Sequence, residues 1–319
     1  MESPFRTTPP STTTPITPAL RTSVPSILYR AAPMETITLP GADGLVLAAD
    51  VTGDPGSPPV VLLHGGGQTR HAWGTTLSHL AAHWRAYSVD LRGHGDSAWA
   101  PDGDYTLDAF ARDVVSVSRS LPEPPVLIGA SLGGIASLAA IAETPPPPVA
   151  RALVLVDVAP RIEAAGVARI GEFMTGHLDG FASLEEVADA IQAYNPHRPR
   201  PKDLSGLKKN MRQRADGRWA WHWDPRFVSG RFGSPDETRS SLVDGDRLAD
   251  AARNITLPTL LVRGRISDLL SAEGAQELLE LVPHAQLVDV AGAGHMVAGD
   301  RNDLFNDAIV SFLDTLRAD

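Results

Sequence analysis

Six short apolar runs recur along the chain from residue 59 onward, with longer amphipathic stretches between them. Apolar runs without polar alternation are typical of strands that are buried on both faces, as in a parallel sheet. Two further segments ahead of them, 35–40 and 45–51, are predicted to form an antiparallel opening pair. The predicted inner strands are 59–65, 86–91, 125–130, 152–158, 259–264 and 285–292.

The stretches between these runs carry apolar residues at helical spacing. In residues 106–121 the apolar side chains share one helical face behind Thr106, which stands where an N-cap is expected. Residues 304–316 show the same period. Strands that alternate with helices predict an α/β fold, with a mostly parallel central sheet covered by helices on both faces.

This alternation stops between about residues 160 and 250, where no buried strand is evident. Ser183 and Glu186 form a capping-box pattern ahead of an amphipathic segment, so the region is predicted to be a mainly helical insertion. The α/β core is then expected at 34–159 and 251–319. Residues 1–33 are rich in Thr and Pro and are predicted to be a disordered leader, because they cannot bury enough apolar surface to offset their ordering entropy.

Composition narrows the classes of function. The 319 residues carry a formal net charge of −10, which argues against a nucleic-acid partner. The absence of cysteine excludes disulfides and thiolate catalysis. No apolar run approaches the roughly 20 residues of a membrane span, and no secretory signal is evident, so no membrane association and a cytoplasmic location are expected. No metal-ligand spacing appears, and no cofactor is predicted.

The stretch "LIGASLGG" at 127–134 carries the clearest chemical signal. Gly129, Ser131 and Gly133 fit G-x-S-x-G between a predicted strand and a predicted helix, the context of a strained turn that exposes a nucleophilic serine. A phosphate-binding loop does not fit, because neither G-x-x-x-x-G-K-[ST] nor G-x-G-x-x-G is present. A structural glycine turn is the remaining alternative. Ser131 is therefore the predicted nucleophile.

A serine nucleophile needs a base that a third group orients. His295, in "AGAGHMVAGD" beyond the last predicted strand, is the predicted base, whereas His64 and His94 are expected to brace loops. Asp268, after the strand 259–264, is the favoured acid because it gives the chain order Ser, Asp, His. Asp157, at the end of the strand 152–158, is the alternative.

The stretch "LLHGGGQ" at 62–68 places three glycines directly after a predicted strand. A loop of this kind can direct a backbone N–H toward a developing oxyanion. The predicted donors are the backbone N–H groups of Gly66, with Gly67 as the alternative, and of Leu132, the residue after the nucleophile. The other reading of the glycine loop is a flexible connector.

The sequence as a whole resembles the α/β-hydrolase superfamily. The motifs "HGGGQTRHAW", "DLRGHGDS", "GASLGG", "RGRISDLLS" and "GAGHM" occur in that family's order across roughly residues 60–296. The resemblance implies the α/β-hydrolase fold, places the nucleophile, acid and base on Ser131, Asp268 and His295, and identifies 160–250 as the cap domain. It is similar to bacterial esterase, lactonase, perhydrolase and epoxide-hydrolase-like members.

The nucleophile type selects among these chemistries. Epoxide hydrolases and haloalkane dehalogenases of the family use an aspartate, because its attack on saturated carbon gives an ester that water can cleave. Ser131 instead favours acyl transfer, and the expected partner is a small, largely apolar ester or lactone. Perhydrolase or epoxide-hydrolase-like chemistry and a non-catalytic small-molecule binding protein remain alternatives. The sequence leaves the oligomeric state open.

Aromatic residues are the candidates for a substrate pocket. Those in the cap could roof an apolar pocket or could pack the cap onto the core. Two more tryptophans follow the loops nearest the nucleophile, and Arg70 and His71 are further candidates for contact with substrate. The aromatic candidates are Trp73, Trp99, Tyr194, Trp219, Trp221 and Trp223.

Overall fold

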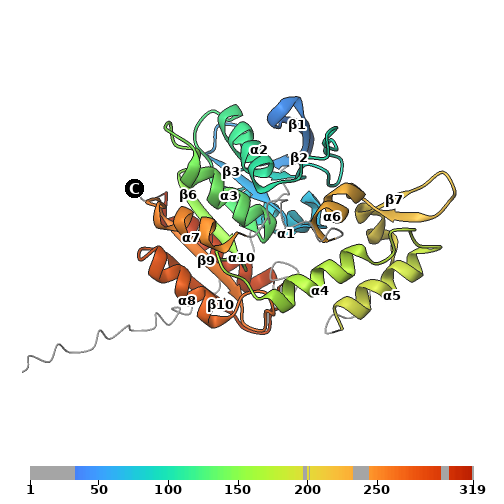
Figure 1. Ribbon diagram of the computed structural model, residues 1–319. Helices are drawn as coiled ribbons and strands as arrows, with labels where there is room; N and C mark the ends of the chain where they lie inside the picture. Colours follow the sequence, from blue (N-terminus) through green and yellow to red (C-terminus); the bar gives the residue numbers. More distant parts are fainter. Residues whose placement is uncertain (1–32, 197–199, 201, 233–243, 296–301, 318–319) are drawn as a thin grey trace, which may run out of the picture. The chain divides into compact units, whose positions relative to one another are not determined.

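The computed structural model describes residues 33–196, 200, 202–232, 244–295 and 302–317. Its central feature is an 8-stranded sheet with the strand order β1-β2-β4-β3-β5-β6-β9-β10 (Figure 1). The predicted leader, residues 1–33, lies outside the described residues except for its last position. The strands of the sheet are β1 (Glu35–Pro40), β2 (Val46–Thr52), β3 (Pro59–Leu63), β4 (Arg85–Val89), β5 (Val126–Ala130), β6 (Ala152–Val156), β9 (Thr259–Gly264) and β10 (Gln286–Val290).

The sheet has the predicted directions. β1 pairs with β2, and β2 with β4, in antiparallel register. The remaining neighbours, from β4 through β3, β5, β6 and β9 to β10, are parallel. The carboxyl ends of these parallel strands therefore meet at one edge of the sheet, which is where ligands bind in open α/β sheets. The prediction of a mostly parallel α/β sheet is confirmed.

Helices cover both faces of the sheet, and successive strand residues supply the two cores. Val60 and Leu62 of β3 belong to a buried cluster with α1 (Gly74–Leu80) and α10 (Asn302–Thr315). Val61 and Leu63 belong to the opposite cluster, with the helices of the second layer. This explains why the strands are continuously apolar. The second layer consists of α2 (Leu107–Ser120), α3 (Leu132–Glu143), α7 (Gly245–Arg253) and α8 (Ala272–Leu281).

Local signals set the helix starts as predicted. The Thr106 hydroxyl accepts a hydrogen bond from the Ala109 N–H at 3.3 Å and caps α2. In the insertion, the Ser183 hydroxyl accepts from the Glu186 N–H at 3.3 Å. Among the described helices, none combines the length and the apolar character that a membrane crossing requires.

The insertion between β6 and α7 is mainly helical (Figure 1). It also contains a short antiparallel hairpin, β7–β8, that the sequence analysis did not predict. Arg247 of α7 forms an ion pair with Glu143 of α3 at 2.7 Å, so α7, which begins within the predicted insertion at 160–250, contacts the second helix layer; the domain boundaries stay a prediction. The elements between β6 and α7, called the cap below, are α4 (Ala164–Thr175), α5 (Leu184–Tyr194), the 3₁₀ helix η3 (Ser205–Asn210), β7 (Met211–Gln213), β8 (Trp219–Trp221) and α6 (Pro225–Phe232).

Candidate active site

Ser131 occupies a strained turn between β5 and α3. Its backbone has φ 45° and ψ −112°, a conformation that residues other than glycine rarely adopt. The turn is held by its own N–H, which donates to the Val156 carbonyl at 3.2 Å. A Cβ on Gly133 would lie 2.4 Å from the Leu63 carbonyl oxygen, so only glycine lets α3 start this close to β3. The geometry leaves the Ser131 side chain half-buried at the carboxyl end of β5.

His295 forms a hydrogen bond with a buried aspartate, Asp157, at the end of β6. The distance from His295 Nδ1 to Asp157 Oδ2 is 2.7 Å, and the carboxylate is fully buried. The Gly264 N–H donates to Oδ1 at 2.9 Å, and the Ser267 hydroxyl donates to Oδ2 at 2.6 Å. An ionised carboxylate only accepts hydrogen bonds, so His295 carries its proton on Nδ1 and leaves Nε2 as an acceptor.

This geometry corrects the prediction that Asp268 orients His295. Asp268 forms an ion pair with Arg169 of α4 at 2.8 Å, and its side chain is 39% exposed. The position of Asp268 follows from the preceding residue, Ser267, whose hydroxyl accepts hydrogen bonds from the Leu269 and Leu270 N–H groups at 3.1 and 3.2 Å. The resulting turn directs the Ser267 hydroxyl to Asp157 and leaves Asp268 beside the cap. The alternative acid of the sequence analysis, Asp157, is the one in contact with the imidazole.

Ser131 and His295 line one cavity of about 690 Å³, together with Leu132 and the glycine loop 65–67. Most of its wall is apolar, and α3, α4, α5 and β8 contribute to it together with the segment that follows β3. Four of the predicted pocket residues, Trp73, Tyr194, Trp221 and His71, belong to the wall. Apolar side chains that line it include Ile135, Val158, Ile162, Val167, Ile170, Phe173, Met174, Ile191, Leu207 and Leu269.

The other predicted pocket residues lie outside this wall. Trp223 is 3% exposed and packs beside Gly67, and Trp219 pairs with Phe181 in a β-bridge. Trp99 is on the surface, where the Arg212 guanidinium lies 5.2 Å from its ring centroid. These three tryptophans therefore pack against other parts of the protein and do not line the cavity. Arg70 is likewise buried, and it forms ion pairs with the carboxylates of Asp50, Asp90 and Asp96.

The backbone N–H groups of the glycine loop have different partners. The Gly65 N–H donates to Gln68 Oε1 at 3.0 Å, and the Gly67 N–H donates to His94 Nε2 at 3.1 Å. Within the described part of the chain, the N–H groups of Gly66 and Leu132 have no hydrogen-bond partner. Both residues line the cavity beside Ser131. The geometry thus favours Gly66 over the alternative, Gly67, as the loop donor.

Two of the histidines near this loop brace it, as expected. His64 is fully buried, with Nδ1 2.8 Å from the Gly65 carbonyl oxygen, and burial lowers its pKa to about 4. His94 holds the Gly67 N–H. A third, His222 of the cap, was not singled out from the sequence. Its signal was the alternation in "WHW", where Trp221 and Trp223 share one side of an extended segment and His222 takes the other.

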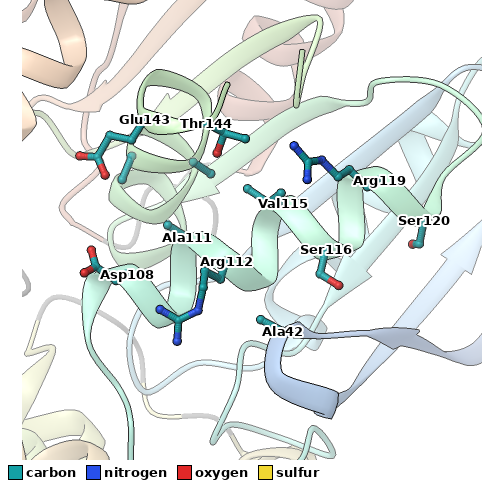
Figure 2. Close-up of a pocket in the computed structure, with 12 residues that line it drawn as sticks. Ala42, Asp108, Ala111, Arg112, Val115, Ser116, Arg119, Ser120, Glu143 and Thr144 are labelled. Atoms are coloured by element: carbon teal, nitrogen blue, oxygen red, sulfur yellow. The ribbon is translucent and has the colours of Figure 1, made fainter. Parts of the chain in front are cut away.

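Two further features of the described residues, clusters of metal-binding side chains and a second hollow, carry no candidate site. Within the described ranges, no group of three or more His, Asp or Glu side chains is arranged to hold a metal ion. A hollow of about 790 Å³ lies along α2 and α3 (Figure 2). Two of its charged residues, Asp108 and Glu143, both form ion pairs with Arg247, and its lining has no histidine to activate a hydroxyl.

Known proteins share this architecture. The profile of the alpha/beta hydrolase family matches residues 60–308. The chain is 31% identical to esterase Rv0045c of Mycobacterium tuberculosis, over 81% of this chain and 84% of the relative. It is 30% identical to the 3-hydroxybutyrate-oligomer hydrolase of Cupriavidus necator, over 76% and 84%.

A solved structure agrees with these relatives. The alpha/beta hydrolase from Novosphingobium aromaticivorans superposes with a TM-score of 0.72 at 28% identity, over 89% of this chain and 99% of that one. The sheet order, the strained serine turn and the match over most of the chain lead to one assignment: this protein belongs to the α/β-hydrolase family.

Proposed function

We propose that the protein is a serine hydrolase that cleaves carboxylic esters, lactones included, of small and largely apolar molecules through an acyl-enzyme. One observation carries the proposal: the strained Ser131 and the Asp157-bound His295 line the same apolar cavity. The names of the relatives, an esterase and a 3-hydroxybutyrate-oligomer hydrolase, support ester cleavage.

Acylation begins with proton transfer from the Ser131 hydroxyl to His295 Nε2. Nε2 is the free acceptor because Nδ1–H donates to Asp157. The serine oxygen attacks the ester carbonyl carbon, and the carbonyl oxygen gains the negative charge. Asp157, buried and ionised, stabilises the imidazolium that forms. His295 then gives the proton to the leaving alcohol, and the acyl group stays on Ser131.

The N–H groups of Gly66 and Leu132 are proposed to bind the oxyanion. Both are free of other partners within the described part of the chain, and Leu132 is the first residue of α3. The positive end of the helix dipole therefore adds to the hydrogen bonds at this position. One oxyanion donor typically contributes about 3 kcal/mol of transition-state stabilisation.

Deacylation repeats the same steps with water as the nucleophile. His295 Nε2 takes a proton from water, the hydroxide oxygen attacks the acyl carbon, and the same two N–H groups bind the second oxyanion. Collapse of this intermediate releases the carboxylic acid, and Ser131 regains its proton from His295.

Hydrolysis of p-nitrophenyl esters and a panel of lactones by wild type and Ser131→Ala tests the proposal. Wild type is expected to hydrolyse these substrates and Ser131→Ala to lose at least about a thousandfold in kcat. Ser78→Ala, on an exposed hydroxyl, is the matched control and should keep full activity. A wild type that neither hydrolyses the panel nor reacts with a fluorophosphonate at Ser131 would contradict the proposal and favour a binding protein.

A further inference from the structure

Three successive peptide groups of the glycine loop are each bound by a buried histidine. His64 Nδ1 lies 2.8 Å from the Gly65 carbonyl oxygen, and His94 Nε2 accepts from the Gly67 N–H at 3.1 Å. His222 Nε2 lies 3.3 Å from the Gly67 carbonyl oxygen. His64 and His94 follow core strands, but His222 comes from the cap, directly after β8.

The partners of His222 fix its direction of hydrogen bonding. The Gly95 N–H donates to His222 Nδ1 at 2.7 Å, so this nitrogen carries no proton. In the neutral ring the proton is then on Nε2, which donates to the Gly67 carbonyl. Burial, with His94 and His64 as smaller contributions, lowers the pKa of His222 well below its usual range and favours this neutral form. The ring thereby bridges two loops of the core.

The cap also packs directly on the residue that His222 binds. Gly67 has φ +76°, and a Cβ there would lie 3.2 Å from Met174 Cε and 3.4 Å from Trp223 Cζ3. Next to His222 in sequence, Trp221 lines the cavity. The segment 221–223 therefore contacts both the space for substrate and the loop that carries the Gly66 N–H.

We propose that His222 is a positioning residue through which the cap orients the oxyanion-binding N–H of Gly66; this rests on the function proposed above. Glycine peptides rotate freely, so the loop needs external partners to hold one orientation. His94 holds the peptide group before the Gly67 Cα, and His222 holds the one after it. The peptide group that His222 holds also carries the Gln68 N–H, which donates to the Gly65 carbonyl at 3.1 Å, and the Gly65–Gly66 peptide group carries the Gly66 N–H. With His222 removed, the Gly67–Gln68 peptide group can turn, this hydrogen bond is lost, and the Gly66 N–H can rotate away from the oxyanion.

Two substitutions separate the hydrogen bonds of His222. In His222→Asn the short amide can still accept from the Gly95 N–H but cannot reach the Gly67 carbonyl. In His222→Gln the longer amide can still donate to that carbonyl. We expect His222→Asn to lower kcat for p-nitrophenyl acetate about tenfold, part of the effect of a lost donor, with KM changed less than about twofold. The inhibition constant of an alkylboronic acid, which forms a tetrahedral adduct on Ser131, should rise about as much. His222→Gln should restore most of both.

Arg226→Gln is the matched control for cap docking. Its guanidinium joins the cap to the Ala100 carbonyl at 2.8 Å and to the Pro101 carbonyl at 3.1 Å, away from the glycine loop. Wild-type kcat in His222→Asn, an equal loss in Arg226→Gln, or no recovery in His222→Gln would each overturn the inference. Amide ¹⁵N shifts of Gly66 and Gly67 should change in His222→Asn and not in Arg226→Gln. This readout needs no turnover, so a wild type without esterase activity would refute the proposed function and leave the contact itself measurable.

Discussion

Two aspartates, Asp157 and Asp268, follow neighbouring strands of the sheet, and their surroundings differ. Asp157, at the end of β6, is fully buried and accepts hydrogen bonds from Gly264 and Ser267 as well as His295. Asp268, beyond β9, is 39% exposed and forms an ion pair with Arg169. Several donors hold a buried carboxylate in one orientation, whereas an exposed ion pair is screened by water. Burial and hydrogen bonding, rather than chain order, are therefore the reasons to propose Asp157 as the acid.

The same contrast separates the buried strand ends from the loop after β9 more generally. His64 after β3, Ser131 after β5 and Asp157 after β6 all have backbone or side-chain partners that fix them. In the loop after β9, the Ser267 hydroxyl donates to the buried Asp157, while Asp268 is exposed and forms an ion pair with Arg169 of the cap. Substitutions at these positions, together with the pH dependence of stability, test this difference.

Asp157→Asn should produce the largest loss. The amide keeps the shape of the carboxylate but removes the charge that stabilises the imidazolium, and it can favour the wrong imidazole tautomer. We expect kcat for p-nitrophenyl esters to fall about 10³–10⁴-fold with KM nearly unchanged. Steady-state kinetics at neutral pH measure this, with the thermal midpoint as the check on folding. Near-wild-type kcat in a folded variant would contradict the role of Asp157.

His64, the buried histidine after β3, should also make the free energy of unfolding depend on pH. The pKa of His64 is about 4 in the folded protein and 6.5 as the ordinary value. Between these values the unfolded state binds more protons, so the free energy of unfolding falls as the pH is lowered through this window. From about pH 7 to about pH 5 the contribution of His64 is about 2 kcal/mol. Guanidinium unfolding at the two pH values measures the difference.

His64→Gln should show a smaller decrease over the same interval, because the titrating group is gone. His79→Gln, at an exposed position of α1, is the control and should keep the decrease of the wild type. Equal pH dependence in wild type and His64→Gln would show that this strand end does not hold a neutral histidine.

Ser267→Ala tests the residue that donates to the buried Asp157 and directly precedes the exposed Asp268. It removes the hydroxyl that donates to Asp157 Oδ2 at 2.6 Å and leaves the carboxylate and His295 in place. A hydrogen bond to a charged group contributes about 1.5–3 kcal/mol. Since part of this is recovered by relaxation, we expect kcat to fall about tenfold. A Ser267→Thr variant keeps the hydroxyl and should recover activity; failure to do so would point to packing instead.

Asp268→Asn should have the smallest effect. The ion pair with Arg169 is close to half exposed on both sides, and such pairs contribute about 0–1 kcal/mol. We expect kcat within about twofold of wild type and a small decrease in the thermal midpoint. Arg169→Gln should match it in both measurements. A loss comparable to that of Asp157→Asn would reverse the comparison and restore Asp268 as the acid.

The fold was predictable because strand burial leaves a strong mark on the sequence. The run at 259–264 matches β9 at both ends, and the other inner strands differ from their predicted runs by at most two residues at either end. Ser131 and His295 could also be singled out from the sequence, since each stands in a short motif whose local backbone the sequence specifies. The geometry brings both to one cavity.

Contacts between segments that are distant in the chain could not be predicted from the sequence in the same way. Whether Asp157 or Asp268 meets His295 depends on the turn that Ser267 makes, and the motif "RGRISDLLS" does not encode its direction. The role of His222 depends on contacts with Gly95 and Gly67, 127 and 155 residues away in the chain. Helical or strand periodicity carries no information about such partners, and the aromatic residues of the cap could not be divided between packing and pocket for the same reason.

The most direct test of the account is the rate at which a fluorophosphonate labels Ser131, followed by intact mass in wild type, Asp157→Asn and Asp268→Asn. This rate reports the nucleophilicity that His295 and its acid confer, independently of any particular ester. The account predicts rapid labelling of Ser131 in wild type and in Asp268→Asn, and labelling slowed at least about a hundredfold in Asp157→Asn. Slow labelling in Asp268→Asn with a wild-type rate in Asp157→Asn would contradict it.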